Sequence, residues 1–532
     1  MSGVKGAVNS KVQLHLGDPS MMLMHRAGLA GLWMTLKQLE QQYPTSAERP
    51  GNLTWSLTPR SISLNWKGQD LEILDWLLKQ SFQISGEGLI LLTGLNPQVM
   101  GIQTQVTIHQ GITGTFLQHN KFFKSNGKEA KSLTVDGREI LVEYKRAESY
   151  AHQHFSRHLC DEKGQLLQER IGVVGWLYPG AVVRHAAFEK QTKFEETPER
   201  AIALLFAPIA CHYFVLPSHL QGKRAQYTLV IPEVTDLELY AKRRWDLRGC
   251  GYKNFYASSL GDAGLRFLTY ETRLELARHH QVERCQVITF GTVAWSSQQK
   301  TRTEIVRVEA TKQVLFNYQV SCNCFSENRV VESRSGNFIN SSFVRGFIAN
   351  NLVRGLPWWF KFSTTIDSQE LFKKIHYERD GLYNMIQKAQ WDEEAQKLFI
   401  RACHEALNKI YAKIYGRTKE DEYAQIGREN ERIRSELLRC MNAESFRSFL
   451  LRFWSRAGHV SITQDYWEEL LPLTTGRIHW KVGRDLALLA LVSYKPRKKS
   501  QAEYPDNSQE SLDKTDSHQV PKEIENSDRP RG

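Results

Sequence analysis

The chain has 532 residues, a formal net charge of +12, and 13 Trp, 19 Tyr and 24 Phe, a length that exceeds one hydrophobic core and predicts about two to four domains. A basic, aromatic-rich chain favours an anionic polymer as partner, although a merely soluble basic protein has the same composition. Eight scattered cysteines, with only Cys322 and Cys324 close together, argue against a disulfide scaffold and indicate a reducing, cytoplasmic compartment.

The first predicted element is a helix within DPSMMLMHRAGLAGLWMTLKQLEQQ, beginning near residue 19 and ending near residue 42. Asp18 is expected to cap its N-terminus, and Pro19 suits the first helical position because no backbone donor is needed there. Ala27, Gly28 and Gly31 would let another backbone approach one face closely. The apolar run is too short to cross a bilayer, and the residues before it do not resemble a signal peptide.

Residues 1–365 alternate strand-like segments with helices, which predicts a mixed α/β region and an α+β fold class. Helices are expected from Asp70 to Phe82 and from Leu260 to His280. The strand-like segments are NLTWSLTP, SISLNWKG, EILVEYK, YTLVIPEV, RCQVITFGTVAWSS and TEIVRVEA.

Residues 366–494 change to long helical patterns joined by short connections, which predicts an antiparallel helical bundle. Its main helices are expected within 392–417, 419–441, 444–458 and 477–494. Residues 495–532 lack an apolar period and are predicted to be disordered. This tail carries eight basic and eight acidic residues, so the net positive charge belongs to the folded part.

Catalytic motifs are absent from the sequence. There is no phosphate-binding GxxxxGK[ST] loop, and the residue four positions after His404 is Asn408, so CHEAL is not a zinc-binding HExxH helix. His25 is expected to be a hydrogen-bonded packing residue. No catalytic residue, metal or cofactor is therefore predicted, although dispersed carboxylates could still converge in a nuclease site.

The densest alternation of basic and aromatic residues is YAKRRWDLRGCGYKNF. Its cations would hold phosphates while Trp245, Tyr252 and Phe255 stack on unpaired bases. A solvated loop with core aromatics would show the same pattern. The candidate nucleic-acid-binding residues here are Arg243, Arg244, Arg248, Lys253 and Asn254.

Three further basic segments are candidates for nucleic-acid contacts. Lys121, Lys124 and Lys128 surround a predicted turn at Asn126–Gly127. The others are a hairpin loop with Ser297, Gln298, Gln299 and Lys300, a donor and acceptor set suited to base edges, and a helical stripe of Arg401, Lys409, Lys413 and Arg417. Most such loops and stripes are merely solvated, so each has a plain structural alternative.

The block HRAGLAGL, which follows a first strand and LGDPS, resembles the N-terminal signature of the myxococcal (MYXAN) subtype of the type I CRISPR Cascade large subunit. That family joins a mixed α/β region to a helical bundle that resembles the small subunit, which agrees with the change of pattern near residue 365.

The resemblance implies a non-catalytic subunit of an RNA-guided DNA-binding complex. Such a subunit contacts the 5′ handle of the guide and recognises the protospacer-adjacent motif, while its bundle contacts target DNA strands. The implied partners are the guide RNA, double-stranded target DNA, the backbone, handle-binding and small subunits, and a helicase-nuclease or transposition proteins, with no membrane. The sequence does not separate DNA destruction from guided transposition.

Two other classes remain open. A basic RNA-binding or RNA-processing enzyme with dispersed catalytic residues would cleave RNA by itself. A structural interaction protein, whose bundle binds another protein, would show no salt-sensitive affinity for nucleic acid.

Overall fold

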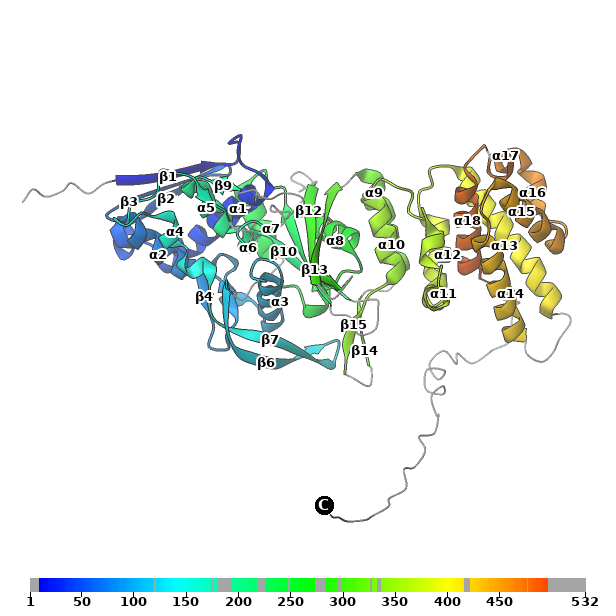
Figure 1. Cartoon of the computed structure of the whole chain (residues 1–532), viewed down its shortest axis with the longest axis horizontal. Helices are drawn as coiled ribbons and strands as arrows, with labels where there is room; N and C mark the ends of the chain where they lie inside the picture. The colour runs from blue at the N-terminus through cyan, green and yellow to red at the C-terminus, as the bar shows by residue number, and fades with distance from the viewer. Residues whose placement is uncertain are drawn as a thin grey trace, which may run out of the picture. The chain divides into compact units, whose positions relative to one another are not determined.

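The computed structural model describes most of the chain up to residue 495 (Figure 1). The described residues are 9–118, 121–173, 176–179, 194–217, 225–246, 249–272, 284–294, 299–309, 311–325, 328–332, 336–415, 422–475 and 477–495. The tail predicted to be disordered, residues 495–532, lies outside the described residues except for Lys495. The chain up to Tyr494 forms one compact unit.

The N-terminal elements are a small antiparallel sheet, ordered β1-β3-β2, and two helices. They are β1 (Asn9–His15), α1 (Leu23–Gln42), β2 (Thr54–Leu57), β3 (Ser61–Lys67) and α2 (Asp70–Ser81). The prediction that α1 begins near residue 19 is wrong. Asp18 instead turns the chain after β1, because its carboxylate accepts from the His15 N–H (3.1 Å) and its own N–H donates to the His15 carbonyl (3.1 Å).

The small residues of α1 confirm the predicted close approach of another backbone. A Cβ atom at Gly28 would overlap the carbonyl oxygen of Ala203, and one at Gly31 would overlap that of Phe206. Ala203 lies near the end of α5 (Pro198–Leu205), and Phe206 lies between α5 and α6 (Ala207–Ala210). The first helix is therefore a packing helix, as its sequence indicated.

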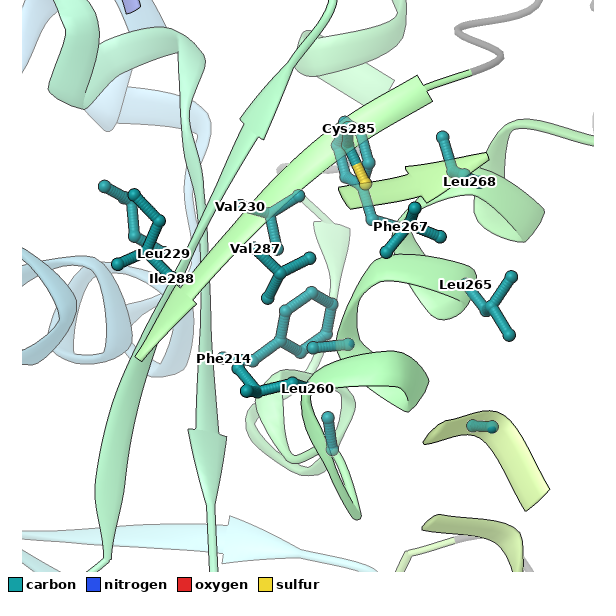
Figure 2. Packing of buried hydrophobic residues seen from close by; sticks show 14 of the residues in the cluster. Phe214, Leu229, Val230, Leu260, Leu265, Phe267, Leu268, Cys285, Val287 and Ile288 are labelled. Carbon is teal, nitrogen blue, oxygen red and sulfur yellow. The ribbon is translucent and has the colours of Figure 1, made fainter. Parts of the chain in front are cut away.

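The main sheet is antiparallel and has the order β10-β11-β12-β13. Its strands are β10 (His212–Leu216), β11 (Gln226–Pro232), β12 (Arg284–Ala294) and β13 (Gln299–Glu309). One face packs on α8 (Leu260–Thr272), and α1 and α3 (Ile102–Gly114) pack on the other. Figure 2 shows Val230 and Val287 on the side of α8, with their neighbours Leu229 and Ile288 on the opposite side, as strand alternation requires. His280, the predicted end of the helix that begins at Leu260, lies outside the described residues.

The strands β6 (Phe123–Val135) and β7 (Arg138–Tyr150) form a long two-stranded ribbon (Figure 1). Residues of this ribbon contribute to a separate small core. Its turn is Asp136–Gly137, both with positive φ (50° and 75°), as two-residue hairpin turns require. The predicted turn at Asn126–Gly127 is wrong, because these residues lie inside β6 at an irregularity between Ser125 and Lys128. The small core consists of Leu89, Val106, Leu133, Val135, Ile140, Val142, Tyr144, Tyr252, Val330 and Ile339.

Short elements connect these parts. The remaining strands are β4 (Phe82–Ile84), β5 (Ile90–Leu92), β8 (Ile171–Gly172), β9 (Glu195–Glu196), β14 (Arg329–Val331) and β15 (Phe338–Asn340). The remaining helices before residue 366 are α4 (Ser156–Leu159), α7 (Leu237–Asp246), α9 (Lys312–Cys324) and α10 (Phe343–Leu352). Single turns of 3-10 helix are η1 (Ser46–Glu48), η2 (Pro50–Asn52), η3 (Thr93–Leu95), η4 (Pro97–Val99), η5 (Ala151–His154), η7 (Tyr252–Phe255) and η9 (Phe362–Thr365).

From residue 369 the described chain is helical, which confirms the predicted change from a mixed region to helices. The helices are α11 (Gln369–His376), α12 (Arg379–Lys388), α13 (Glu394–Tyr415), α14 (Glu422–Leu438), α15 (Ala443–Ala457), α16 (Ser461–Asp465), α17 (Trp467–Thr475) and α18 (Trp480–Ser493). The last of them, α18, packs against α12, α13 and α14, and its residues from Leu486 to Ser493 are all buried.

Helices on the two sides of residue 365 also pack together. The amide of Asn317 in α9 donates to the carbonyl of Gln390 (3.2 Å) and accepts from its N–H (2.8 Å). Glu378, between α11 and α12, accepts from the N–H of Phe343 at the start of α10 (3.0 Å). The division into domains 1–365 and 366–494 therefore stays a prediction.

Candidate nucleic-acid interface

The segment with the densest basic and aromatic pattern is largely core. Leu237, Tyr240, Ala241 and Arg244 form the buried face of α7, because helical periodicity brings these positions to one side. Arg244 is 3% exposed, and its Nη2 donates to the Cys211 carbonyl (3.3 Å). The sequence pattern predicted that the Arg244 guanidinium lies on the surface and holds phosphates, whereas in the structure it is buried.

The three rings predicted to stack on bases are also engaged inside the protein. Tyr252 and Phe255 are buried, and Trp245 donates its Nε1 hydrogen to the Gly94 carbonyl (2.8 Å). Phe255 stacks on the imidazole of His212, with ring centroids 5.5 Å apart. The alternative reading of this segment, core aromatics, is therefore correct for these side chains.

Some polar groups of the segment do reach the surface. Arg243 and Asn254 are half-buried. Lys253 is half-buried as well, and its ammonium lies 2.8 Å from the carboxylate of Asp136, so it ties η7 to the turn of the ribbon. Arg248 lies outside the described residues.

The base of the ribbon gathers exposed lysines. Lys121, Lys124 and Lys128 are all exposed, and Lys124 lies 3.0 Å from the carboxylate of Glu148. Lys128 stands directly opposite Lys145, which is also exposed. Like charges at directly opposed strand positions repel each other, so a polyanion bound across both strands would relieve this repulsion.

Lys145 is not among the residues predicted from the sequence, although the sequence contains a signal for it. The Asp136–Gly137 dipeptide is a strong two-residue turn signal, and counting outward from it pairs residue 128 with residue 145, as the structure does. The wrong turn at Asn126–Gly127 concealed this pairing.

The predicted motif-reading hairpin lies at the end of β12 and β13. β11 pairs with β12 only up to Phe290, whereas β12 and β13 stay paired from Gly291–Arg302 to Ala294–Gln299. The two strands therefore continue as a ribbon beyond their neighbour. Gln299 and Lys300 are the first residues of β13, and Ser297 and Gln298 lie outside the described residues.

The predicted stripe on α13 is mostly occupied by helix packing. Lys409 donates to the His459 carbonyl and lies 2.9 Å from the Glu405 carboxylate. Lys413 donates to the Arg456 carbonyl (2.6 Å), at the C-terminal end of α15, where a cation is favourable. Arg401 is exposed, and Arg417 lies outside the described residues. The structure thus does not present these cations as one continuous free stripe.

A different basic and aromatic group lies at the start of α18, and we call it the Trp480 cluster. It consists of Arg477, His479, Trp480, Lys481 and Arg484. The indole of Trp480 stacks on His479, while the Lys481 Nζ and the Arg484 guanidinium lie 5.8 and 5.1 Å from its ring centroid. Arg477, His479 and Lys481 are exposed. The sequence RIHWKVGR shows this alternation within the segment predicted to be the final helix.

The histidines singled out in the sequence serve packing. His25 is fully buried with its Nε2 2.9 Å from the Glu196 carboxylate, and burial lowers its pKa against the raising effect of that carboxylate. Burial lowers the pKa of His404 to about 4, and its Nε2 lies 3.0 Å from the Ala490 carbonyl. Neighbouring Glu405 accepts from the N–H groups of Ser461 (2.9 Å) and Ile462 (3.2 Å), and its hydrogen bonds lower its pKa to about 2 despite desolvation.

Within the described residues, no group of three or more His, Cys, Asp and Glu side chains is arranged to hold a metal ion. In the same part of the chain, no helix combines the length and apolarity needed to cross a membrane.

Comparison with known proteins gives matches at both ends of the chain. Residues 13–205 match the DevT N-terminal domain, and residues 387–525 match the DevT C-terminal domain. The chain is also 28% identical, over an alignment of 542 positions, to the CRISPR-associated protein Cas8a1/Csx13 of Myxococcus xanthus. The alignment covers 94% of this chain and 92% of that protein. The chain belongs to the myxococcal Cas8-type family of large subunits. The family expected from HRAGLAGL is confirmed, and with it the role of a Cascade large subunit.

Proposed function

We propose that this large subunit is non-catalytic and binds guide RNA and target DNA through three surfaces of its fold. They are the lysines at the base of the β6–β7 ribbon, the protruding end of the β12–β13 hairpin, and the basic groups of the helical region. The observation that carries the proposal is the opposition of Lys128 and Lys145 on an exposed ribbon. Such a pair is unfavourable unless an anion neutralises it.

The ribbon lysines suit a phosphate backbone, and we assign them to the guide RNA near its 5′ handle. Four ammonium groups, from Lys121, Lys124, Lys128 and Lys145, lie on or beside one end of the ribbon. Phosphate contacts of this kind fix position without reading sequence. The carboxylate of Glu148 forms a direct ion pair with Lys124 (3.0 Å).

The β12–β13 hairpin suits recognition of the protospacer-adjacent motif. A two-stranded ribbon fits the major groove of duplex DNA, and this hairpin continues past β11. Its amides, Gln298 and Gln299, have the donors and acceptors that base edges require.

The helical region would contact a DNA strand, with the Trp480 cluster and Arg401 as its phosphate and base contacts. An indole flanked by two cations offers both stacking and charge. Residues 366–494 would then act as a unit that resembles the small subunit. Other Cascade subunits and a helicase-nuclease or transposition machinery complete the proposed set of partners.

The decisive experiment compares two double variants in complexes purified with guide RNA. One variant carries both Lys128→Ala and Lys145→Ala, and the control carries both Arg157→Ala and Lys163→Ala. The second pair removes two exposed cations from another part of the surface. The ribbon variant should weaken guide binding for all sequences and reduce the log-log salt slope by about 1.4, because each single-strand phosphate contact contributes roughly 0.7. An equal log-log salt slope in both variants would show that the ribbon lysines do not bind the guide.

Motif reading needs its own test. Gln298→Ala with Gln299→Ala should change the preferred motif in a randomised-motif library while the complex still assembles. An unchanged preference would place motif reading elsewhere. RNA cleavage by the purified wild-type chain would support the alternative, an RNA-processing enzyme.

A further inference from the structure

One lysine, in the segment between α10 and α11, has a backbone conformation that lysine rarely adopts. Lys361 has a φ of 57° and a ψ of 34°, in the left-handed region. The other described non-glycine residues with positive φ are Asn52, Asn96 and Asp136, whose residue types tolerate this conformation. Glycine would adopt it without strain, so the backbone gives no reason for a lysine at this position.

Polar groups of α18 hold this segment in place. Asp485 is 3% exposed, and its carboxylate accepts a hydrogen bond from the N–H of Ser363 (3.2 Å) and interacts with the backbone of Lys361. The Arg484 Nη2 donates to the Ser363 hydroxyl (3.0 Å). A strained backbone persists only where the surrounding structure enforces it, and such residues are concentrated at functional sites. The fold therefore fixes Lys361 next to the Trp480 cluster.

The side chain that this backbone carries is a cation beside an aromatic ring. Lys361 is exposed, and its ammonium lies 5.5 Å from the centroid of the Phe360 ring. The Trp480 ring has a similar environment, because Lys481 and Arg484 lie beside it. Cations combined with aromatic rings are typical of surfaces that bind an unpaired nucleic-acid strand.

The start of α18 is rich in positive charge. The N-terminal end of a helix is itself partly positive and is stabilised by acidic side chains, but the first turn of α18 contains none and includes Lys481. Arg484 follows in the next turn, and its Nε is buried without a hydrogen-bond partner among the described residues. The carboxylate of Asp485 lies 3.8 Å from the Arg484 Nη2 and also holds the segment before α11. An anion bound here would be attracted by these cations and by the helix end together.

We propose that Lys361 and the Trp480 cluster form one site for a phosphodiester group of an unpaired DNA strand, with a neighbouring base beside the aromatic rings. The lysine is kept in spite of its strained backbone because its ammonium binds the phosphate. The site rests on the proposed contact of the helical region with DNA, and it adds a residue from outside that region and the kind of strand that is bound.

Three variants of Lys361 separate the role of its ammonium from that of its backbone. Lys361→Gly and Lys361→Asn remove the charge and suit the left-handed conformation, so their thermal unfolding midpoints should equal or exceed that of the wild type. Lys361→Arg keeps both the charge and the strain.

Binding is measured on guide-loaded complexes with two probes, a single-stranded DNA oligonucleotide and a DNA duplex, neither of which is complementary to the guide. For the single strand, the two neutral variants should bind more weakly, with a log-log salt slope reduced by about 0.7, the contribution of one phosphate contact. Lys361→Arg should match the wild type. Duplex binding should stay the same in all three variants.

A double variant of the Trp480 cluster distinguishes this site from the proposed function on which it rests. Arg477→Ala with Lys481→Ala should also reduce the salt slope for the single strand. If this variant reduces the slope and the neutral Lys361 variants do not, Lys361 is not part of the site, and the DNA contact of the helical region stands. If none of them changes the slope, both proposals are wrong.

Three further results would overturn the role given to Lys361. A lower unfolding midpoint in Lys361→Gly would show that the side chain stabilises the fold. An equal loss of binding in Lys361→Arg would show that charge is not the reason for the lysine. An equal loss of duplex binding in the neutral variants would show that the site does not select an unpaired strand.

Discussion

Two basic segments of this large subunit look alike in sequence and differ in structure. In the α7–η7 segment, cations alternate with aromatic residues, and much of that pattern is buried, with Arg244 and Phe255 at 3% and 2% exposure. At the base of the β6–β7 ribbon, the lysines stay exposed and two of them face each other. Basic and aromatic alternation on a helix can therefore describe a core face, while strand register can assemble a charged surface from distant residues.

The largest effect should come from Arg244 on stability. Arg244→Ala removes a buried side chain that donates to the Cys211 carbonyl, and should lower the free energy of unfolding by about 1–3 kcal/mol. Urea denaturation measures this change. Arg244→Met, which keeps the aliphatic stem, should lose less. If Arg244→Ala kept its stability but bound nucleic acid more weakly, Arg244 would be a binding residue and not a core residue.

Stability should also depend on pH through His212 of β10, which stacks on Phe255 of the α7–η7 segment. Burial, Arg244 and Arg266 lower the pKa of His212 well below its usual value. Because the folded pKa lies below the unfolded one, this histidine's contribution is present above about pH 6.5 and is lost as the pH falls below it. Urea midpoints at pH 7 and pH 5 should therefore lie closer together in His212→Phe than in the wild type, while other buried histidines, such as His109 and His404, keep part of the difference. Arg244→Met should show a part of this convergence.

On the ribbon, stability and binding should change in opposite directions. Lys128→Glu places a carboxylate opposite Lys145 and should raise the free energy of unfolding by roughly 0.2–1 kcal/mol. The same change should weaken guide binding, because it replaces a phosphate-binding cation by an anion. Thermal unfolding and a binding titration on one preparation test both parts. Parallel losses of stability and binding would mean that Lys128 is structural.

The smallest effect should come from Lys253, which joins the two segments through Asp136. Side-chain exposures of 30% and 44% leave this ion pair open to solvent. Lys253→Met should therefore cost about 0.5 kcal/mol or less at low salt and nothing measurable at high salt. A larger loss that persists in high salt would show that the ammonium does more than hold the ribbon turn.

Local chemistry explains which features could be predicted from sequence. Glycines at helical spacing predicted the close approach at Gly28 and Gly31, because only a missing Cβ permits it. Helix and strand periodicities located most elements. Asp18 and Pro19 misled the prediction of the helix start, since capping residues also make turns, and here Asp18 closes a turn after β1.

The candidate site was harder to predict because it depends on tertiary contacts. The reason Lys413 is not a free cation is that the end of α15 lies beside it, which no pattern within α13 reveals. The Lys128–Lys145 pair depends on register, which follows from the correct turn. The Trp480 cluster was visible in sequence, but its ring gains its cationic neighbours only when α18 folds.

The central position of α18 also bears on the synthesis of this protein. The helices α12, α13 and α14 all pack against a segment that leaves the ribosome after them. Until Leu486 and its buried neighbours emerge, the apolar faces of these earlier helices have no permanent cover, and such intermediates are prone to aggregation. A chain that stops before residue 480 would thus lose the folding of its whole helical region, not merely its last helix.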